Sequence, residues 1–436
     1  MINIDFENYE KRVKSASVMS YEGRVVKIIG LTIEAEGIKA SVGELCTIIS
    51  LSDEHIKAEV VGFKEGLVIL MPLGEVIGVA PGCKVISNNE TFSIRCSDEL
   101  LGRVIDGIGN PIDGRGPIGG DKYSIYNSPP NPMERKRIKD IMPTGIKAID
   151  SCITVGVGQR IGLFAGSGVG KSTTMGMIAR CAEADVNVIC LVGERGREVL
   201  DFLERDLGEE GLKKSVIVCS TSDKSPLVRV KGALTATTIA EYFRDQGKNV
   251  ILMMDSVTRF AMAKREIGLA VGEPPAQKGY TPSVFAELPR LMERTGTSDK
   301  GSITAFYTVL VDGDNFNEPI ADAVRGILDG HIVLSRDLAH KNHYPAIDVS
   351  NSVSRLMNEI CDDEHKYFAS RVRDTLAVYK EAEDLISIGA YEFGTSESID
   401  TAINYIDKVN SYLKQPVNES FSFEENIDNL KNIFRS

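Results

Sequence analysis

Residues 161–174 read I-G-L-F-A-G-S-G-V-G-K-S-T-T, and the rest of the chain is best interpreted outward from this stretch. An apolar run enters a glycine-rich turn, and a helix-compatible run, residues 175–184, follows it. Glycines let the backbone wrap an anion with its N–H groups pointing inward, and the helix behind the turn presents its positive end to that anion. The order of strand, glycine turn and helix therefore predicts a phosphate-binding loop.

The residue types inside this loop assign its chemistry. Lys171 is predicted to reach the β- and γ-phosphates of a nucleotide, and the Ser172 hydroxyl to hold Mg²⁺. The strict pattern has glycine six positions before the lysine, where this chain has Ala165. A glycine-rich turn with a chance G-K-S is the alternative interpretation. The remaining predicted nucleotide contacts are Gly166, Ser167, Gly168, Val169, Gly170 and Thr173.

Composition limits the class of protein. The chain has 436 residues, 42% hydrophobic and 26% charged, which is typical of two or three globular domains. Its formal net charge of −12 argues against a large nucleic-acid footprint. The eight cysteines show no C-x-x-C and no zinc spacing, and no apolar run approaches the ~18 residues that span a bilayer. With no secretory leader recognised, we expect reduced thiols in a cytosolic protein.

The first 132 residues divide into three segments of different composition. Residues 1–17 are polar and suit either a disordered tail or a short partner-docking helix. Residues 18–97 predict a small closed β-barrel, for which an assembly role is favoured over nucleic-acid binding because aromatic residues are few. Residues 100–132 are rich in Gly and Pro, which predicts turns, a linker and the first domain boundary. The β-prone runs of the barrel are residues 24–33, 45–49, 57–63, 67–71 and 84–86.

Beyond the barrel, residues 98–350 alternate apolar runs with helical stretches. This alternation predicts an α/β domain with a mostly parallel sheet. Past Ser350 we expect no strand, and residues 351–436 are predicted to form a helical C-terminal domain. The predicted strands are 160–165, 186–192, 215–219, 250–255, 302–311 and 331–334, and the predicted C-terminal helices are 356–363, 365–381, 396–413 and 424–434.

Two carboxylates follow apolar runs of the α/β domain. Asp255 ends N-V-I-L-M-M-D, and a strand-end Asp beside a phosphate loop completes the Mg²⁺ shell through water. Glu194 and Arg195 lie in L-V-G-E-R-G-R-E after another strand. Glu194 is placed to polarise an attacking water, and Arg195 to neutralise charge on the phosphoryl group. By spacing alone, a surface Glu–Arg pair is an equal alternative. Arg355, in S-N-S-V-S-R, is by its residues alone a surface or helix-capping arginine.

Together these motifs resemble the catalytic subunits of rotary ATPases, and more closely the ATPases of flagellar and type III secretion protein export. Ala165 is the residue that export ATPases carry in their loop, where the rotary β subunit has Gly. The blocks that carry the closer match are G-L-F-A-G-S-G-V-G-K-S (162–172), G-E-R-G-R-E-V (193–199), P-P-A-Q-K-G-Y-T-P-S-V-F-A-E-L-P-R-L-M-E-R-T-G (274–296), Y-P-A-I-D-V-S-N-S-V-S-R (344–355) and L-L-G-R-V-I-D-G-I-G-N-P-I-D-G (100–114).

The resemblance implies a β-barrel, a RecA-like core and a helical C-terminal domain, with ATP as substrate and Mg²⁺ as cofactor. It implies that Glu194 is the general base or positions the water, and that Arg195 contacts the γ-phosphate. It also implies that Arg355 is a finger donated to the adjacent subunit. Tyr344 would stack on adenine, and Phe423 would add to that pocket.

Because one chain carries the loop, Glu194 and Arg355, we expect a homohexamer with equivalent interface sites. Residues 274–280 would line its pore and grip a coiled-coil stalk protein. The resemblance further implies a stator-like regulator at the N-terminus, an export gate, export substrates and their chaperones as partners, at the inner face of the cytoplasmic membrane. A flagellar system is favoured. The alternatives are an injectisome ATPase, a rotary ATP synthase β-like subunit or an RNA translocase.

Overall fold

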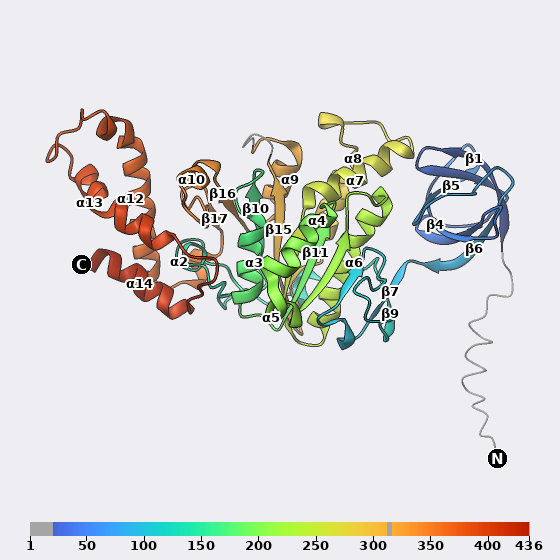
Figure 1. Cartoon of the computed structure of the whole chain (residues 1–436), viewed down its shortest axis with the longest axis horizontal. Coiled ribbons are helices and arrows are strands. Elements are labelled where there is room, and N and C mark those ends of the chain that lie inside the picture. Colours follow the sequence, from blue (N-terminus) through green and yellow to red (C-terminus); the bar gives the residue numbers. More distant parts are fainter. Residues whose placement is uncertain (1–20, 312–315, 436) are drawn as a thin grey trace, which may run out of the picture. The chain divides into compact units, whose positions relative to one another are not determined.

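A computed structural model describes residues 21–311 and 316–435 (Figure 1). The predicted tail or helix at residues 1–17 lies outside them. The contacts divide the chain into two compact units, which are described separately. Of the described residues, the first unit contains 21–93 with the segments Ser225–Leu227 and Glu266–Pro274, and the second contains the rest.

The first unit contains a closed six-stranded barrel in the order β1-β2-β5-β4-β3-β6. Alternate residues of each strand point inward, and Val25, Ile33 and Ile48 are among those that fill the core. The single strand predicted at residues 24–33 is wrong, because Gly30 (φ 57°) turns the chain there and makes a hairpin. The strands are β1 (Glu22–Ile29), β2 (Thr32–Glu36), β3 (Glu44–Ile49), β4 (His55–Lys64), β5 (Leu67–Pro72) and β6 (Lys84–Thr91).

The second unit is built on a sheet in the order β17-β16-β10-β15-β13-β11-β12-β8, in which β14 also pairs with β15. The strands from β16 to β8 run parallel, as predicted. Each of the six predicted strands is present to within one residue at either end. They are β10 (Arg160–Ala165), β11 (Val186–Val192), β12 (Ser215–Ser220), β13 (Asn249–Asp255), β15 (Ser302–Leu310) and β16 (Gly330–Leu334), and the short β14 is Gly296–Thr297.

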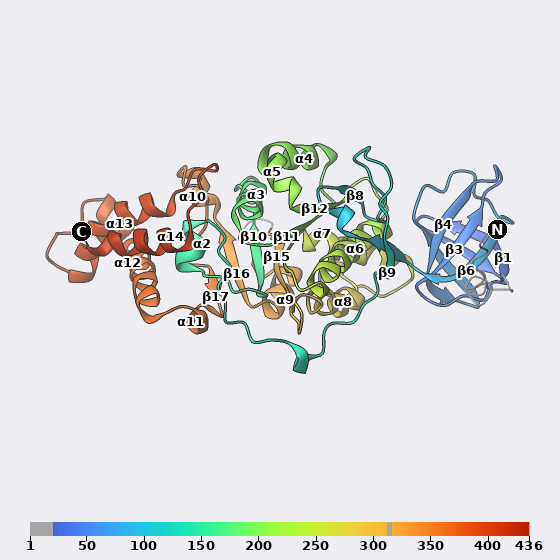
Figure 2. The same cartoon turned by 90° about the horizontal axis from the view of Figure 1, so that it is seen from below.

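Helices cover both faces of this sheet, which explains why its strands are continuous apolar runs. In Figure 2, α3, α4 and α5 lie on one side of the sheet, and α6, α8 and α9 on the other. None of the helices in residues 21–311 and 316–435 is long and apolar enough to cross a membrane. The helices of this region are α2 (Lys147–Cys152), α3 (Lys171–Cys181), α4 (Gly196–Asp201), α5 (Gly208–Lys213), α6 (Pro226–Asp245), α7 (Val257–Ala270), α8 (Pro282–Met292), α9 (Pro319–Ile327) and α10 (Arg336–His340).

The Gly- and Pro-rich segment 100–132 is more than the predicted turns and linker. Its residues Val104–Asp106 form β8, the edge strand of the sheet, which runs parallel to β12. Arg103, only 6% exposed, anchors this strand by donating from Nε to Asp113 Oδ2 at 2.7 Å and from a second nitrogen to Asp113 Oδ1 at 2.9 Å. The Arg103 guanidinium in turn holds the pKa of Asp113 well below its usual range.

The C-terminal region is helical, with two departures from prediction. Val353–Ser354 form β17, a two-residue strand antiparallel to β16, where no strand was expected. The predicted helix 356–363 shrinks to α11 (Met357–Ile360), because the Asp362 carboxylate caps the next helix by accepting from His365 N at 2.7 Å. The remaining helices are α12 (Asp363–Ser387), α13 (Glu397–Leu413) and α14 (Phe423–Arg435).

The Arg103–Asp113 pair gives a test of how β8 is held. Replacing Asp113 with Ala leaves a nearly buried guanidinium without its carboxylate, so we expect a loss of about 2 kcal/mol in the free energy of opening β8. Hydrogen exchange of the β8 and β12 amides measures this locally. The matched control is Glu210→Ala, whose partner Lys213 is exposed and whose removal should leave these amides unchanged. Equal exchange in the two variants would contradict the assignment.

Candidate nucleotide-binding site

The glycine-rich loop lies where the central strand β10 meets α3. Gly168 (φ 78°) and Gly170 (φ 89°) adopt the left-handed conformation that lets the loop turn back over the helix N-terminus. Val169 is 1% exposed and packs into the hydrophobic core, which holds the loop in place. Ala165 is the last residue of β10, pairs with Leu310 and Leu334, and has no positive φ. The departure from the strict pattern is therefore tolerated, because this position does not need the conformational freedom of glycine.

The side chains predicted for phosphate, water and metal converge on this loop. Lys171 Nζ donates to Asp255 Oδ1 and lies 3.4 Å from Glu194 Oε1. Asp255 ends β13, and Glu194 follows β11, so neighbouring parallel strands deliver both carboxylates to the same edge of the sheet. Thr308 on β15 donates from Oγ1 to Asp255 Oδ1 at 2.6 Å and fixes that carboxylate. Sequence reasoning missed Thr308, because a threonine inside an apolar strand gives no signal of its own.

Burial and charge tune this cluster in opposite directions. Burial is the largest effect on Glu194 and raises its pKa to about 7, although Lys171 opposes the shift. Burial alone would lower the pKa of Lys171, but Asp255 and Glu194 outweigh it and the net pKa is raised. Near neutral pH Lys171 is therefore charged, while Glu194 exists in both its protonated and its ionised form.

Arg195 is not brought to this cluster. Its side chain is 82% exposed, and its guanidinium nitrogen lies 3.7 Å from Glu198 at the start of α4. Arg259 instead packs against Gly193, the residue before Glu194. A Cβ built on Gly193 would lie 3.0 Å from Arg259 Cβ and 3.3 Å from its Cδ, so the arginine stem packs directly on that glycine. Within the described residues, Arg259 Nε is buried without a hydrogen-bond partner.

The position of Arg259 one helical turn after Asp255 is the sequence signal that was overlooked. It lies in S-V-T-R, which opens α7 directly behind the strand-end carboxylate. A cation at this position is expected to lie close to the ligand that the Asp255 carboxylate helps to bind. Its unpaired buried Nε marks it as a group available to an anion.

Tyr344 borders the loop from the other side. Two carbons of its ring lie 3.7 Å from the Cβ position of Gly170, and the side chain is 41% exposed. The Tyr344 carbonyl accepts a hydrogen bond from Gln415 N at 3.0 Å. The buried Gln415 side chain accepts from Lys147 N and donates to the carbonyls of Gly145 and Glu419. This glutamine therefore fastens the segment between α13 and α14 beside the loop.

Phe423, predicted to share the pocket of Tyr344, contacts another aromatic ring. It begins α14, and its ring meets the ring of His365 edge to face at 5.8 Å. The contacts of the described residues include none between Phe423 and Tyr344. In the same segment Phe421 lies under the Lys147 ammonium, 4.1 Å from the ring centroid. The role of Phe423 in the adenine pocket stays a prediction.

Arg355 lies at the opposite edge of the sheet from the loop of its own chain. It follows β17, whose Ser354 pairs with Gly330 at the start of β16, whereas the loop follows the far end of β10. Four residue steps along β16, from Gly330 to Leu334, separate the two ends, a span of about 13 Å. The Arg355 side chain is exposed, and it donates to the Arg325 carbonyl at 3.3 Å.

A phosphate-binding loop, with carboxylates at the ends of two neighbouring parallel strands, defines an ATPase-type nucleotide-binding domain. Comparison with known proteins identifies the family. Residues 145–354 match the nucleotide-binding domain of the ATP synthase alpha/beta family, residues 25–89 match its beta-barrel domain, and residues 361–432 match the T3SS EscN ATPase C-terminal domain. The chain belongs to this family of ATPases, and the resemblance inferred from its motifs is confirmed.

Individual relatives cover nearly the whole chain. The flagellum-specific ATP synthase of Bacillus subtilis is 56% identical over 94% of this chain and 94% of its own length. The type 3 secretion system ATPase of Xanthomonas euvesicatoria is 48% identical over 97% of this chain and 96% of its own. Among solved structures, the assembled ATPase EscN of the enteropathogenic E. coli type III secretion system superposes with a TM-score of 0.90 at 47% identity, covering 94% of this chain and 99% of that one.

The role of Gln415 beside Tyr344 is open to measurement. Gln415→Leu leaves the Lys147 N–H and the Gly145 carbonyl unpaired in a buried place, so the Tyr344 segment should loosen. We expect the affinity for a fluorescent ATP analogue to fall about fivefold to tenfold, with kcat at saturating ATP nearly unchanged. Gln246→Leu, at an exposed glutamine, is the matched control. A fall in kcat without a change in affinity would argue that Gln415 serves the reaction rather than the base pocket.

Proposed function

We propose that this chain hydrolyses MgATP in a homohexameric ring that energises protein export through a flagellar type III apparatus. One observation carries the proposal. The loop, Glu194 and Asp255 meet at one edge of the sheet, while Arg355 of the same chain lies at the other edge. Identical subunits packed head to tail would join the two edges at every interface. The assembled state of the related EscN, 47% identical, supports this arrangement.

The chemistry follows from the side chains. Lys171 and the backbone N–H groups of the loop from Gly166 to Thr173 bind the phosphates. The Lys171 ammonium then turns from Asp255 and Glu194 to the more highly charged γ-phosphate. The released Glu194 carboxylate accepts a proton from the water that attacks phosphorus, and the bond to the β–γ bridging oxygen breaks. Arg259 and a reoriented Arg195 neutralise charge on the transferred group, and Tyr344 stacks on the adenine.

The donor set at the loop fits Mg²⁺. Ser172 is the second residue of α3, directly after Lys171, and Asp255 is held in place by Thr308. The Ser172 hydroxyl and the Asp255 carboxylate are the hard oxygen ligands that this ion prefers. Ser172 would ligate the ion directly, and Asp255 would complete its shell through water. When bound, Mg²⁺ would supply positive charge that offsets the charge of the phosphates.

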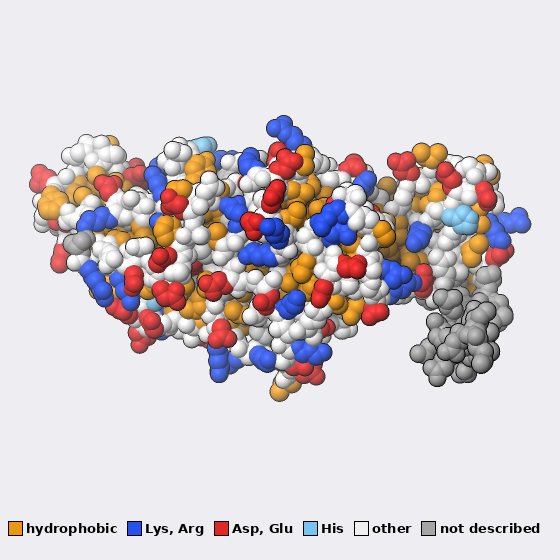
Figure 3. Space-filling model, turned by 60° about the horizontal axis from the view of Figure 1, so that its bottom comes forward, with side chains coloured by type: hydrophobic (Ala, Val, Ile, Leu, Met, Phe, Trp, Pro, Cys, Tyr) orange, Lys and Arg blue, Asp and Glu red, His pale blue; other side chains and the backbone are white. Residues whose placement is uncertain are grey.

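In this proposal Arg355 enters the site of the adjacent subunit as a finger. Residues 274–280 face the pore, where a coiled-coil stalk protein binds. The related EscN has been solved in complex with its central stalk EscO, at a TM-score of 0.87 to this chain. A stator-like regulator binds the N-terminus, and the ring works at the cytoplasmic face of the membrane on an export gate, export substrates and their chaperones. Nucleic acid is not among the proposed partners. On the face shown in Figure 3, basic and acidic side chains are interspersed rather than gathered into one basic surface.

Glu194 gives the proposal a pH signature. Because the water-activating form is the carboxylate, and burial raises the pKa of Glu194 to about 7, kcat/KM for ATP should fall about tenfold per pH unit below neutrality and level off above it. Profiles are measured in excess Mg²⁺, so that the nucleotide does not titrate in this range. Glu194→Gln should lose at least ~10³-fold in kcat and keep its affinity for an ATP analogue. Wild-type activity in Glu194→Gln would contradict the mechanism.

The injectisome is the second candidate system, because a type 3 secretion system ATPase is 48% identical to this chain. Genetic complementation separates the two. We expect this chain to restore motility in a strain that lacks its flagellar export ATPase, and not to restore effector secretion in a strain that lacks its injectisome ATPase. Lys171→Ala is the control that keeps the fold but loses the phosphate contact. Restored secretion without restored motility would reverse the assignment.

A further inference from the structure

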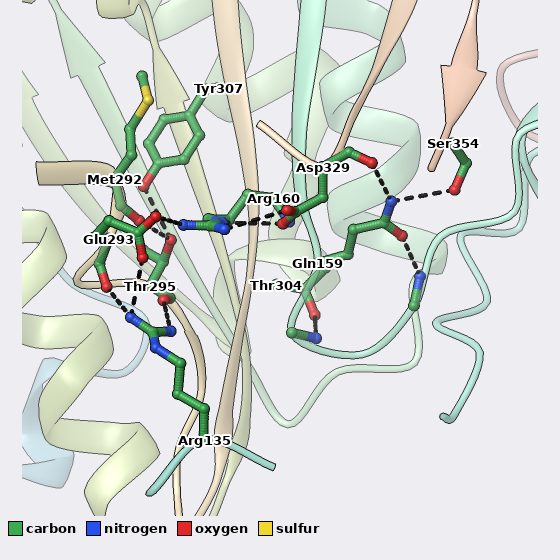
Figure 4. Close-up of polar contacts among 12 residues, drawn as sticks. Arg135, Gln159, Arg160, Met292, Glu293, Thr295, Thr304, Tyr307, Asp329 and Ser354 are labelled. Carbon is green, nitrogen blue, oxygen red and sulfur yellow. Dashed lines mark hydrogen bonds and ion pairs between the residues drawn. The ribbon is translucent and has the colours of Figure 1, made fainter. Parts of the chain in front are cut away.

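A cluster of polar side chains ties together three strands at the edge of the sheet opposite the phosphate loop (Figure 4). At its centre is Gln159, which is fully buried and directly precedes β10. Gln159 Nε2 donates to the Asp329 carbonyl at 3.0 Å and to Ser354 Oγ at 3.1 Å. Its Oε1 accepts from Gly156 N at 2.7 Å. One amide group therefore connects the start of β10, the start of β16 and the end of β17.

Asp329 is the second member of the cluster. Arg160 holds its carboxylate from two sides, with Nε 3.0 Å from Oδ2 and the terminal NH2 3.2 Å from Oδ1. The opposite end of the Arg160 guanidinium pairs with Glu293 at 2.5 Å. The Asp329 carbonyl is thereby fixed in direction, and it accepts from Arg355 N at 3.0 Å. The backbone of Arg355 is thus hydrogen-bonded to Asp329, whose carbonyl is held by Gln159 and whose carboxylate is held by Arg160.

Ser354, the residue before the arginine, is held in the same way. Its hydroxyl accepts from Gln159 and donates to the Thr154 carbonyl at 2.7 Å. β17 contains only two residues at the sheet edge, so its ladder with β16 supplies little rigidity. The direction in which the chain leaves the sheet at Arg355 depends instead on these side-chain hydrogen bonds.

We propose that Gln159 and Ser354 are positioning residues for Arg355, which set the direction in which its guanidinium leaves the sheet edge towards the neighbouring subunit. This inference rests on the proposed function, in which Arg355 acts in trans. A finger is worth roughly 10³- to 10⁵-fold in rate, and displacing a catalytic group by about 1 Å costs on the order of 10²-fold. Losing the clamp should therefore reduce turnover while the loop of the same subunit still binds ATP.

Two variants and one control probe the clamp. Gln159→Met keeps the side-chain volume and removes both donated hydrogen bonds, and we expect kcat to fall about 10- to 100-fold. Ser354→Ala removes one hydroxyl with little risk to folding, and we expect about a fivefold to tenfold fall. Affinity for a fluorescent ATP analogue should stay within about twofold of wild type in both. The control is Ser302→Ala, a buried hydroxyl at the same sheet edge that donates only to Asn249 Oδ1, and its kcat should be unchanged.

Mixed rings distinguish positioning in trans from a general weakening of the sheet. Each variant is mixed in equal amounts with Lys171→Ala, a subunit whose own loop is inactive and whose Arg355 is intact. If Gln159 serves only the finger, the loop of a Gln159→Met subunit recovers when Lys171→Ala supplies the finger. One interface in four then has both halves intact, so activity should rise to about a quarter of the wild-type value. Glu194→Gln mixed with Lys171→Ala should not recover, because both subunits fail on the loop side.

The reference pair is Arg355→Ala with Lys171→Ala. Recovery in this pair without recovery for Gln159→Met or Ser354→Ala would overturn the positioning role and leave the proposed function intact. No recovery in the reference pair would contradict donation of Arg355 in trans, and the positioning inference would fall with it. A fall in nucleotide affinity in the unmixed Gln159→Met and Ser354→Ala proteins would likewise overturn it, because the damage would then lie in their own loops.

Discussion

The Lys171 ammonium lies between two carboxylates, and the rest of the site depends on that contact. Asp255 and Glu194 reach it because the parallel strands β13 and β11 are neighbours and end at the same edge. In a site this buried, neither a lone ammonium nor a lone carboxylate pair would be tolerated without its counter-charge. An incoming triphosphate brings more negative charge than the carboxylates it displaces. In the proposed mechanism, the contact that offsets these buried charges would therefore release the Glu194 carboxylate when the substrate binds.

Functional residues lie at both ends of the parallel strands, and the direction of each strand decides which end its residues reach. All of the strands that deliver loop, carboxylate and threonine run parallel, so their chemistry collects where they end. β17 runs the other way, and it carries Arg355 to the edge where those strands begin. An arginine at that edge cannot serve its own loop across about 13 Å of sheet. The proposed ring of identical chains is an arrangement that would bring both halves together.

The apolar runs predicted the six longer parallel strands to within a residue, because strands buried on both faces have to be continuously hydrophobic. Short elements escaped prediction for a physical reason. β8 and β17 contain three and two residues and owe their existence to neighbours and to clamps such as Arg103–Asp113, which no local pattern encodes. The motifs correctly predicted that Lys171, Glu194 and Asp255 lie together, but a motif does not specify the direction in which a side chain points. Arg195 points outward, Arg259 packs under Gly193, and Phe423 faces His365.

The joint between the loop helix and the C-terminal helices is as tightly determined as the site. Asp150 in α2 is fully buried and accepts hydrogen bonds from the backbone of Thr144 and Gly145 and from Asn426 of α14. Burial nevertheless raises its pKa to about 6. Gly145 (φ 72°) admits no side chain, since a Cβ there would lie 2.5 Å from Cys181 Cβ in α3. Moving α14 against α2 would break the buried hydrogen bond between Asn426 and Asp150, at a cost on the order of 1–3 kcal/mol, and Gly145, held by the same Asp150, packs directly on α3. A change at the nucleotide loop is therefore expected to move these helices with α3, instead of being absorbed between them.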